Sequence, residues 1–228
     1  MIEIRSLASG SRGNCYYVSD GVTPVLLECG IGWKEIQRGL NFRTSELDGC
    51  LVSHEHQDHC KAIPDLLRAG IDVYCSQEII DIFGNAHHRL LKIKPLEKFY
   101  IGSWAVLPFP LVHDVENLGF LMASKGGGKL AYITDSAYCK YKFKGLTNLL
   151  IECNYSLDLL KESDLDTEVK KRIIRNHMSI ERVKDFLRAN DLSKLEEIWL
   201  LHLSDDNSDA ERFKREVQSL TGKMVFVA

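Results

Sequence analysis

An apolar run that leads straight into a cluster of ionisable side chains is the feature that most constrains how this chain folds. Residues 51–63 read LVSHEHQDHCKAI, so three histidines and two acids occupy six consecutive positions after the apolar residues. The run has the length of a buried strand. A solvated loop would suit a lone histidine, but unpaired imidazoles and carboxylates are poorly stabilised beside a buried strand. We therefore expect the cluster to form a site at the end of a covered strand.

The other apolar runs are equally short and are bounded by Gly, Pro or Asp, which is typical of strands in a covered sheet. Strands are predicted over residues 2–8, 14–19, 24–30, 48–53, 71–75, 97–102, 103–113, 117–124, 129–136, 148–154, 196–204 and 223–228. Helical patterns cover residues 59–70, 76–84, 157–188 and a last segment that opens at Ser208 and Glu211. Ser76 and Ser179 are predicted N-caps. Strand-rich halves that are each followed by helices predict an α/β or α+β layered sandwich.

The composition fits one compact domain over residues 1–228 and excludes several classes of function. The chain has 228 residues, of which 45% are hydrophobic and 27% charged, and such a chain can bury a sizeable core. A formal net charge of −3 argues against a non-specific nucleic-acid coat. No apolar run has the length of a signal peptide or a bilayer span. Seven cysteines form no C-x-x-C pair. We therefore expect a cytoplasmic protein without a membrane partner, whose cysteines are mostly buried small hydrophobes.

The residue types in the cluster favour a pair of divalent metal ions. Imidazole nitrogens and carboxylate oxygens suit zinc, manganese or iron. Because alternate residues of an extended segment point the same way, His54 and His56 are predicted to hold one ion together. After a bend in the chain, Asp58 and His59 would hold a second ion. Two ions about 3.5–4 Å apart suit hydrolysis, since both polarise the substrate and a water between them becomes hydroxide near neutral pH.

Three further candidates end other predicted strands. His113 ends the run LPFPLVH, Asp135 ends LAYITD, and His202 ends WLLH. Each of these residues could instead have a purely structural role, as an acid that caps a helix or as a hydrogen-bonded histidine in the core. Together with His54, however, they place ionisable groups at four strand ends, which is the layout of a site on one rim of a sheet sandwich.

The H-x-H-x-D-H string, followed by a His, by an Asp in TDS and by a His in LHLS, resembles the metallo-β-lactamase superfamily. The resemblance covers essentially the whole chain. It implies an αββα four-layer sandwich with a dinuclear site at its edge, occupied by two divalent ions such as zinc or manganese. The implied ligands are His54, His56 and His113 for the first metal, Asp58, His59 and His202 for the second, and Asp135 as a bridge between both.

A narrower set of strings resembles the YycJ/WalJ-like branch of that superfamily: SLASGSRGNCYYV, SHEHQDH, ITDS, LIECNY, NHMS and LHLSDDN. That branch is associated with phosphodiester cleavage, including exonuclease activity on DNA, and the chain resembles the tRNase Z and β-CASP nucleases more distantly. A carboxylate at Asp135, rather than a cysteine, argues against the β-lactam-cleaving branch. One departure is that Cys60, Lys61 and Ala62 stand where many members have a glycine. We expect this to alter the helix start behind the second metal without removing a ligand.

Residues outside the ligand set favour a phosphate substrate. In the loop SGSRGN, glycines let backbone N–H groups converge on an anion, and Ser11, Arg12 and Asn14 can donate further hydrogen bonds. An ordinary hairpin turn would use the same glycines. His177 stands at a loop-to-helix junction, with Ser179 as N-cap, where helix N-termini attract phosphate. His177 is therefore a candidate to protonate a leaving alkoxide, and the resemblance to related nucleases implies a histidine from this region, although a plain helix-start histidine is the alternative.

Several other polar residues can be interpreted either as part of the site or as ordinary surface residues. The two basic runs would either line a path for a nucleic-acid backbone or form a solvated surface. They comprise Lys140, Lys142 and Lys144, and then Lys170, Lys171, Arg172 and Arg175. Glu28 is a candidate to orient a ligand histidine, but its spacing gives no support. His87 and His88 fit no motif and are expected at the surface.

These features together predict a metal-dependent phosphodiester hydrolase, an exonuclease-like nuclease acting on DNA or RNA through a hydroxide held between two metals. Asp58 is expected to orient or deprotonate the water, and His177 to protonate the leaving oxygen. The alternatives are a small-molecule phosphodiesterase acting on a cyclic nucleotide or a phospholipid headgroup, a thioester hydrolase of the glyoxalase type, and a non-catalytic module that keeps the metals. The sequence leaves open the choice between DNA and RNA, the polarity of cleavage, the native metal and the oligomeric state.

Overall fold

Two mixed β-sheets dominate the computed structural model, which describes residues 1–84 and 87–228. The strands of the first sheet follow chain order and are β1 (Glu3–Ala8), β2 (Cys15–Ser19), β3 (Pro24–Leu27), β4 (Gly49–Leu51), β5 (Val73–Cys75) and β6 (Leu90–Lys92). The pairs β1–β2 and β2–β3 are antiparallel, whereas β3 to β6 are parallel. The carboxyl ends of β3 to β6 therefore meet at one edge, where the histidine cluster begins.

The second sheet has the order β13-β12-β11-β10-β9-β8-β7. Its strands are β7 (Phe99–Ile101), β8 (Trp104–Pro110), β9 (Leu118–Ser124), β10 (Lys129–Ile133), β11 (Asn148–Glu152), β12 (Glu197–Leu201) and β13 (Met224–Val227). The glycine run at 126–128 lies in the hairpin turn between the antiparallel strands β9 and β10. Pro108 and Pro110 lie beyond the part of β8 that pairs with β7, so they leave only β9 as a strand partner. Such a position suits proline, because proline cannot donate to a ladder.

The two sheets face one another across a shared apolar core. Tyr16 and Leu27 of the first sheet belong to the same buried cluster as Trp104, Phe120 and Tyr132 of the second. All five side chains are fully buried. Burying a large apolar side chain contributes about 1.5–3 kcal/mol, so this interior layer holds the sheets together and fixes the edge on which the site is built.

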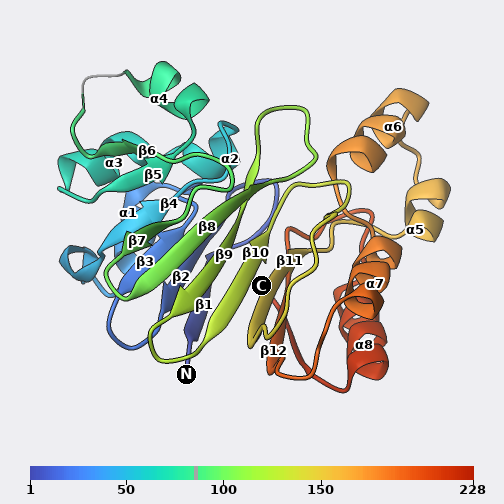
Figure 1. Ribbon diagram of the computed structural model, residues 1–228. Coiled ribbons are helices and arrows are strands. Elements are labelled where there is room, and N and C mark those ends of the chain that lie inside the picture. Colours follow the sequence, from blue (N-terminus) through green and yellow to red (C-terminus); the bar gives the residue numbers. More distant parts are fainter. Residues whose placement is uncertain (85–86) are drawn as a thin grey trace.

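Helices cover the outer faces of both sheets, which completes the predicted αββα four-layer sandwich (Figure 1). They are α1 (Trp33–Gly39), the 3₁₀ turn η1 (Thr44–Glu46), α2 (Gln57–Cys60), α3 (Ile63–Arg68), α4 (Gln77–Phe83), α5 (Leu157–Glu162), α6 (Thr167–Asn176), α7 (Ile180–Ala189) and α8 (Ala210–Thr221). Ser76 and Ser179 cap α4 and α7 as predicted. Within the described ranges, no helix is both long and apolar enough to cross a bilayer.

Two helix predictions are wrong in detail. The single helix expected over 59–70 is two helices, because the backbone N–H of Ala62 donates to the carbonyl of Cys29 instead of continuing α2. The carbonyl of His59 accepts from Cys29 in turn. Tertiary hydrogen bonds to the end of β3 thus override the local helical pattern. The last helix is capped by Asp209, whose carboxylate accepts from the backbone N–H of Arg212, and not by Ser208.

Asp20 links the two sheets at the edge of the sandwich opposite the histidine cluster. Its Oδ2 accepts hydrogen bonds from Ser103 Oγ at 2.6 Å and Ser124 Oγ at 2.8 Å, and its Oδ1 accepts from the backbone N–H of Thr23 at 2.9 Å. Burial alone would raise the pKa of Asp20, but the hydrogen bonds from Ser103, Thr23 and Ser124 outweigh burial and lower it. The ionised carboxylate is therefore the form that the fold stabilises.

We expect Asp20→Ala to lower the free energy of unfolding by about 1.5–3 kcal/mol at neutral pH, since hydrogen bonds to a charged group are lost. Because the folded-state pKa lies below the unfolded value of about 3.9, the contribution is present above that value and is lost as the pH falls through the lowered pKa. Urea unfolding of wild type and variant at neutral pH and near pH 3 measures this. A stability difference that stays the same at both pH values would contradict the assignment.

Candidate metal centre

The loops that follow four strands place ionisable residues at one edge of the sandwich. His54 follows β4, His113 follows β8, Asp135 follows β10 and His202 follows β12. The structure brings all seven predicted ligands into two groups, and in each group the ligand atoms lie within 4.8 Å of one another. The first group is His54, His56 and His113, and the second is Asp58, His59, Asp135 and His202.

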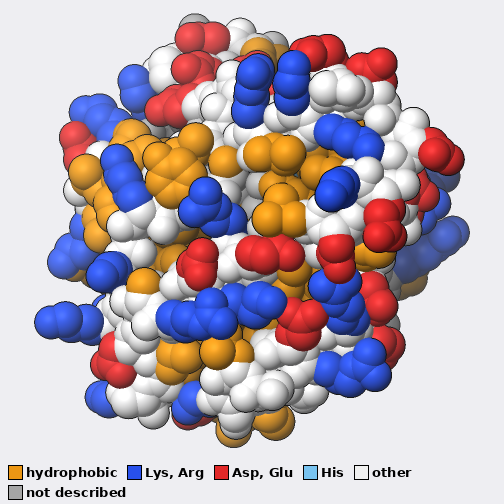
Figure 2. Space-filling view, turned by 90° about the vertical axis from the view of Figure 1, so that its right-hand side faces the viewer, with side chains coloured by type: hydrophobic (Ala, Val, Ile, Leu, Met, Phe, Trp, Pro, Cys, Tyr) orange, Lys and Arg blue, Asp and Glu red, His pale blue; other side chains and the backbone are white. Residues whose placement is uncertain are grey.

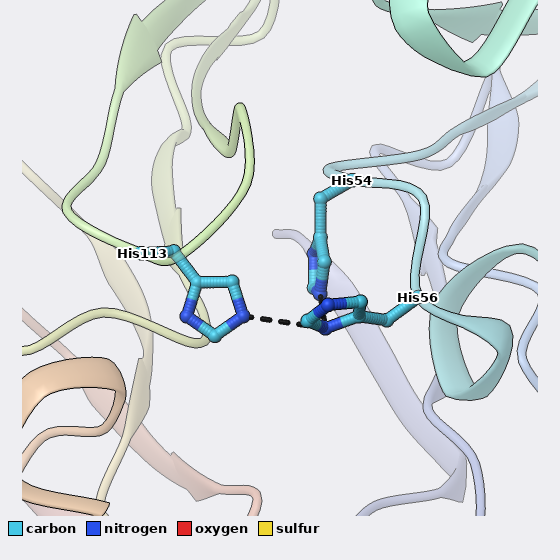
Figure 3. A group of neighbouring side chains, drawn as sticks. All are labelled: His54, His56 and His113. Atoms are coloured by element: carbon cyan, nitrogen blue, oxygen red, sulfur yellow. Dashed lines mark hydrogen bonds between the residues drawn. The ribbon is translucent and has the colours of Figure 1, made fainter. Parts of the chain in front are cut away.

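The three histidines of the first group point their ring nitrogens at a common point (Figure 3). His56 Nδ1 lies 3.1 Å from His54 Nε2 and 3.3 Å from His113 Nε2. Nitrogens that bind one zinc ion at about 2.0–2.1 Å in a tetrahedron stand about 3.3 Å apart. The observed spacing therefore has the dimensions of a set of ligands around one ion.

The protonation of His113 also fits a cation at that point. Its Nδ1 lies 3.1 Å from the backbone carbonyl of Asn176, which only accepts, so Nδ1 carries the proton and Nε2 presents a lone pair. Asp114 Oδ1 lies 3.1 Å from the same Nε2. Burial lowers the pKa of both His54 and His113, which favours their neutral, metal-binding forms. Nitrogen lone pairs that face one another without a proton between them repel, and a bound cation would remove this repulsion.

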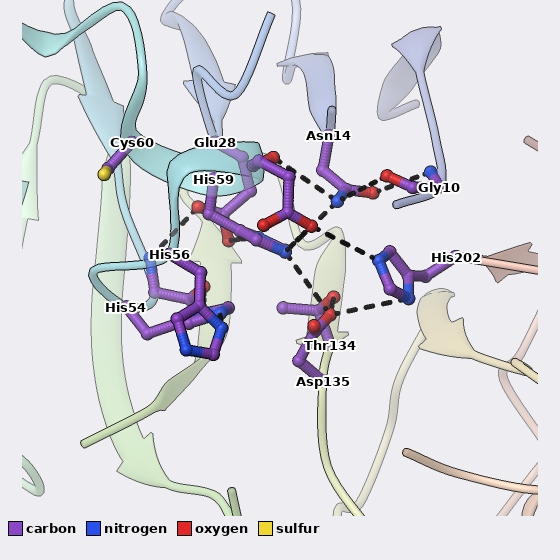
Figure 4. Close-up of polar contacts among 12 residues, drawn as sticks. Gly10, Asn14, Glu28, His54, His56, His59, Cys60, Thr134, Asp135 and His202 are labelled. Carbon is purple, nitrogen blue, oxygen red and sulfur yellow. Dashed lines mark hydrogen bonds and ion pairs between the residues drawn. The ribbon is translucent and has the colours of Figure 1, made fainter. Parts of the chain in front are cut away.

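The second group surrounds His59, which is fully buried (Figure 4). His59 Nε2 lies 3.4 Å from Asp58 Oδ2 and 3.4 Å from Asp135 Oδ1. His202 Nε2 lies 3.6 Å from Asp58 Oδ2 and is a buried nitrogen without a hydrogen-bond partner in the described residues. An orphaned buried nitrogen facing carboxylates is the observation that fits a metal here, because such a polar atom is otherwise destabilising.

The electrostatics of the second group favour positive charge. Burial alone would lower the pKa of His202, but the carboxylates of Asp135, Asp58 and Glu152 outweigh burial and raise it to about 10. The pKa of His59 is raised for the same reason, with Asp135 the main contributor. Burial alone would raise the pKa of Asp135, yet His202 and His59 hold it well below its usual range. A divalent cation could replace the protons that these carboxylates stabilise on His59 and His202.

A close approach of the backbone places the short helix α2 beside the end of β3. The backbone N–H of Asn14 donates to the carbonyl of Asp58 at 2.7 Å, and that of Cys29 donates to the carbonyl of His59 at 2.8 Å. A Cβ atom on Gly30 would stand 1.6 Å from the Asp58 carbonyl oxygen, so only glycine fits there. Gly30 thus allows the two loops to hold Asp58 and His59 in position.

Glu152 is a buried acid of this site that the sequence analysis did not single out. It is fully buried at the end of β11, and its Oε1 accepts from His177 Nδ1 at 2.6 Å and lies 3.3 Å from His202 Nδ1. Its Oε2 accepts from the backbone N–H groups of Ser136 and Met178. Glu152 therefore joins the loop after β10 to the segment between α6 and α7, and it fixes the orientation of both histidines. The available signal was an acid inside an otherwise apolar run, which must find a partner once buried.

Glu28 holds His59 from behind. Its Oε1 lies 3.6 Å from His59 Nδ1, both side chains are fully buried, and its Oε2 accepts from the backbone N–H of Ser53 at 3.1 Å. The placement agrees with a role in orienting a ligand histidine. Glu28, Asp135 and His202 all have positive φ angles, of 65°, 42° and 52°. Such strained backbone outside glycine is typical of functional sites.

His177 lies where the prediction requires it, beside the two metal groups. It follows α6 directly and, with its Nδ1 bound to Glu152, leaves Nε2 as the nitrogen free for a substrate. Burial alone would lower the pKa of His177, but the Glu152 carboxylate outweighs burial and raises it. A cavity of about 330 Å³ opens between these groups, and its lining includes Ser11, His56, Asp58, Arg172 and His177.

The predicted substrate-binding residues are separated by the structure. Ser11 lines the metal-site cavity and also a neighbouring cavity of about 460 Å³, whereas the exposed Arg12 lines only the neighbouring cavity, together with Lys61. Asn14 is fully buried, and its side-chain nitrogen lies 3.1 Å from His59 Nε2. Ser179 is buried and caps α7. Asn14 and Ser179 therefore support the site from the interior, and in these buried positions neither side chain contacts a substrate directly.

The cysteines lie largely where they were expected, since six of the seven are buried. Cys60, next to His59, is fully buried, and burial raises the pKa of its thiol to about 12. The protonated thiol is directed to the backbone carbonyl of Glu55. Cys60 is consequently a buried packing residue, and it belongs to neither group of predicted ligands.

Comparisons with known proteins agree with this geometry. The family described as "Beta-lactamase superfamily domain" matches residues 23–202. The chain is 27% identical to "Exodeoxyribonuclease YycJ" of Bacillus anthracis, over 94% of this chain and 87% of that protein. It is 26% identical to "Exodeoxyribonuclease WalJ" of Streptococcus pneumoniae, serotype 2 strain D39, over 90% of this chain and 82% of that protein. The solved structure of the metallo-beta-lactamase fold protein YhfI from Bacillus subtilis superposes with a TM-score of 0.77 at 17% identity, covering 100% of this chain and 96% of that one, which confirms the predicted fold.

Proposed function

The chain belongs to the beta-lactamase superfamily, and from this premise we propose that it is a metal-dependent phosphodiesterase that degrades DNA as an exonuclease. Two relatives named exodeoxyribonuclease align with at least 90% of the chain, which supports DNA as the substrate. The αββα fold by itself supports no particular reaction, because one fold hosts many chemistries. The residues around the metal groups carry the rest of the proposal.

The observation that carries the proposal is the composition of the 330 Å³ cavity. It places ligands of both metal groups beside one cation, Arg172, and one imidazole, His177. A guanidinium binds phosphate oxygens with a fork of donors, and an imidazole can give a proton to a leaving alkoxide. A phosphodiester needs both functions, whereas a thioester or a lactam presents no phosphate to the cation.

Each residue then has a part that its contacts support. His54, His56 and His113 would hold one divalent ion, Asp58, His59 and His202 a second, and Asp135 both, with zinc or manganese the metals that suit these donors. When bound, such ions supply Lewis-acid polarisation of the phosphate and lower the pKa of water. Asp58, partly exposed to the cavity, would orient the attacking water. His177, held through Nδ1 by Glu152, would protonate the leaving oxygen from Nε2.

A time course on DNA and RNA tests the proposal. Single- and double-stranded strands labelled at the 5′ or the 3′ end are incubated with the protein and Mn²⁺ or Zn²⁺. Stepwise shortening of DNA from one end is the expected result, and the label shows which end is attacked. Hydrolysis of small diesters such as bis(p-nitrophenyl) phosphate without any cleavage of strands would instead support a small-molecule phosphodiesterase.

Glu28→Gln should weaken binding of one metal by about 10- to 100-fold, because outer partners of ligand histidines typically have effects of this size. The neutral amide cannot stabilise the proton on His59 Nδ1 as the carboxylate does. Competition with a chromophoric chelator measures the affinity of each ion in wild type and variant. Unchanged affinity for both ions would show that Glu28 only packs behind the site.

A further inference from the structure

We propose that a groove between the loop after β10 and helix α7 binds the single strand of DNA whose end enters the metal site. The groove has a volume of about 190 Å³, and its lining includes Tyr138, Lys140, Tyr141, Lys142 and Arg182. We call it the α7 groove. The inference rests on the proposed nuclease function for its substrate, but the groove itself stands on features outside the metal centre.

The first feature is a set of cations that nothing neutralises. Lys140, Lys142 and Arg182 have no carboxylate within 4 Å in residues 1–84 and 87–228. Asp185, the one acid that lines the groove, is paired with Arg188 at 3.2 Å. Unneutralised positive charge is complementary to a phosphate backbone.

The second basic run differs in this respect. Lys170 Nζ donates to the backbone carbonyls of Lys161 and Ser163, and Lys171 is paired with Glu168 at 2.7 Å. The ammonium groups of these two lysines are therefore already bound by residues of α5, α6 and the turn between them. Arg172 alone of that run lines the metal-site cavity. Of the two basic runs, Lys140 and Lys142 line the α7 groove and Arg172 lines the metal-site cavity.

The third feature is an exposed aromatic side chain in the lining of the groove, close in the sequence to Asp135. Tyr138 is 46% exposed, although large aromatic side chains are usually buried. Its backbone is held beside the site, since Ser136 Oγ donates to the Tyr138 carbonyl and accepts from the backbone N–H of Val112. Only two residues lie between Asp135 and Tyr138, so their Cα atoms, three residue steps apart, are at most about 11 Å from one another.

An exposed aromatic ring beside unneutralised cations is the combination that binds single-stranded nucleic acid, because bases stack on the ring and phosphates follow the charge. Paired bases in a duplex do not offer their faces to such a ring. On the face of the molecule that carries α7, basic side chains stand beside exposed apolar ones (Figure 2). Tyr141 anchors the groove, with its ring packed on Phe109 at 5.3 Å and Lys140 Nζ 5.4 Å above it.

Fluorescence anisotropy with a labelled oligothymidylate tests the groove, with EDTA present so that no strand is cleaved. The double variant Lys140→Ala/Lys142→Ala should make the slope of the logarithm of the association constant against log salt concentration less negative by about 1.4, because each lost contact to a single strand accounts for about 0.7. Tyr138→Ala should weaken binding roughly 5- to 150-fold, the range for loss of one stacked base. Tyr138→Phe, which keeps the ring, should bind as wild type does.

Lys144→Ala is the matched control, because Lys144 belongs to the same alternating run but does not line the groove. It should keep the wild-type slope. A wild-type slope in Lys140→Ala/Lys142→Ala, wild-type affinity in Tyr138→Ala, or equal affinity of the wild-type protein for duplex DNA would each overturn the groove. Cleavage assays report on the proposed nuclease separately: a protein that binds as expected yet cleaves no phosphodiester would overturn that activity and leave the groove standing.

Discussion

We expect Asp58→Ala and His56→Ala each to reduce kcat/KM on single-stranded DNA by at least about 10³-fold while the protein stays folded. Each variant removes one donor from a metal group, and bound metals contribute several kcal/mol to transition-state stabilisation in hydrolases. The folded state should survive because both side chains are partly exposed, so truncation leaves no buried cavity. Asp58→Ala also removes a carboxylate that lies within 3.6 Å of both His59 and His202.

Initial rates with Mn²⁺ supplied measure the loss, and circular dichroism checks the fold. His88→Ala is a suitable control, because His88 is an exposed histidine outside both metal groups, and it should retain full activity. Hydrolysis by metal-free protein, or wild-type rates in either ligand variant, would show that the histidine and aspartate groups do not carry the reaction.

His177→Ala should lower kcat on DNA by about 10²- to 10⁴-fold, the usual contribution of a positioned acid or base. KM should change much less, since Arg172 and the α7 groove remain. The loss should depend on the leaving group. The alkoxide of a nucleotide needs a proton as it departs, whereas p-nitrophenolate leaves readily without one. Activity on bis(p-nitrophenyl) phosphate should therefore fall only slightly in the same variant.

The comparison of the two substrates separates proton donation from a structural role. Glu152→Gln serves as the companion variant, because it leaves the imidazole in place but removes the carboxylate that fixes it at 2.6 Å. It should show a smaller loss with the same dependence on the leaving group. Equal losses on DNA and on bis(p-nitrophenyl) phosphate in His177→Ala would mean that the ring only supports the metal loops.

The sequence predicted which side chains gather at this edge because their spacing and their neighbours are both local signals. His54 and His56 alternate at the end of an apolar run, and His113, Asp135 and His202 each follow another such run. Parallel strands end at a common edge, so residues distant in the chain could be expected to meet. The fold prediction succeeded for the same reason, since short bounded apolar runs define the strands of both sheets.

The supporting residues were harder to predict because their signal is tertiary. Glu152 and Glu28 stand inside apolar runs, and nothing local shows which histidine each contacts. Asn14 was expected to bind substrate, but a polar loop residue gives no sign of the direction in which its side chain turns. The break at Ala62 depends on a hydrogen bond to Cys29, a residue that follows β3 and is distant in the sequence.

Anomalous scattering from crystals soaked in Mn²⁺ tests the central claim most directly. The predicted result is two peaks, one among the rings of His54, His56 and His113 and the other among Asp58, His59 and His202. Asp135 should contact both. A map with no peak at this edge of the sandwich, or with a single ion bound elsewhere, would contradict the account of the site and the hydrolytic function built on it.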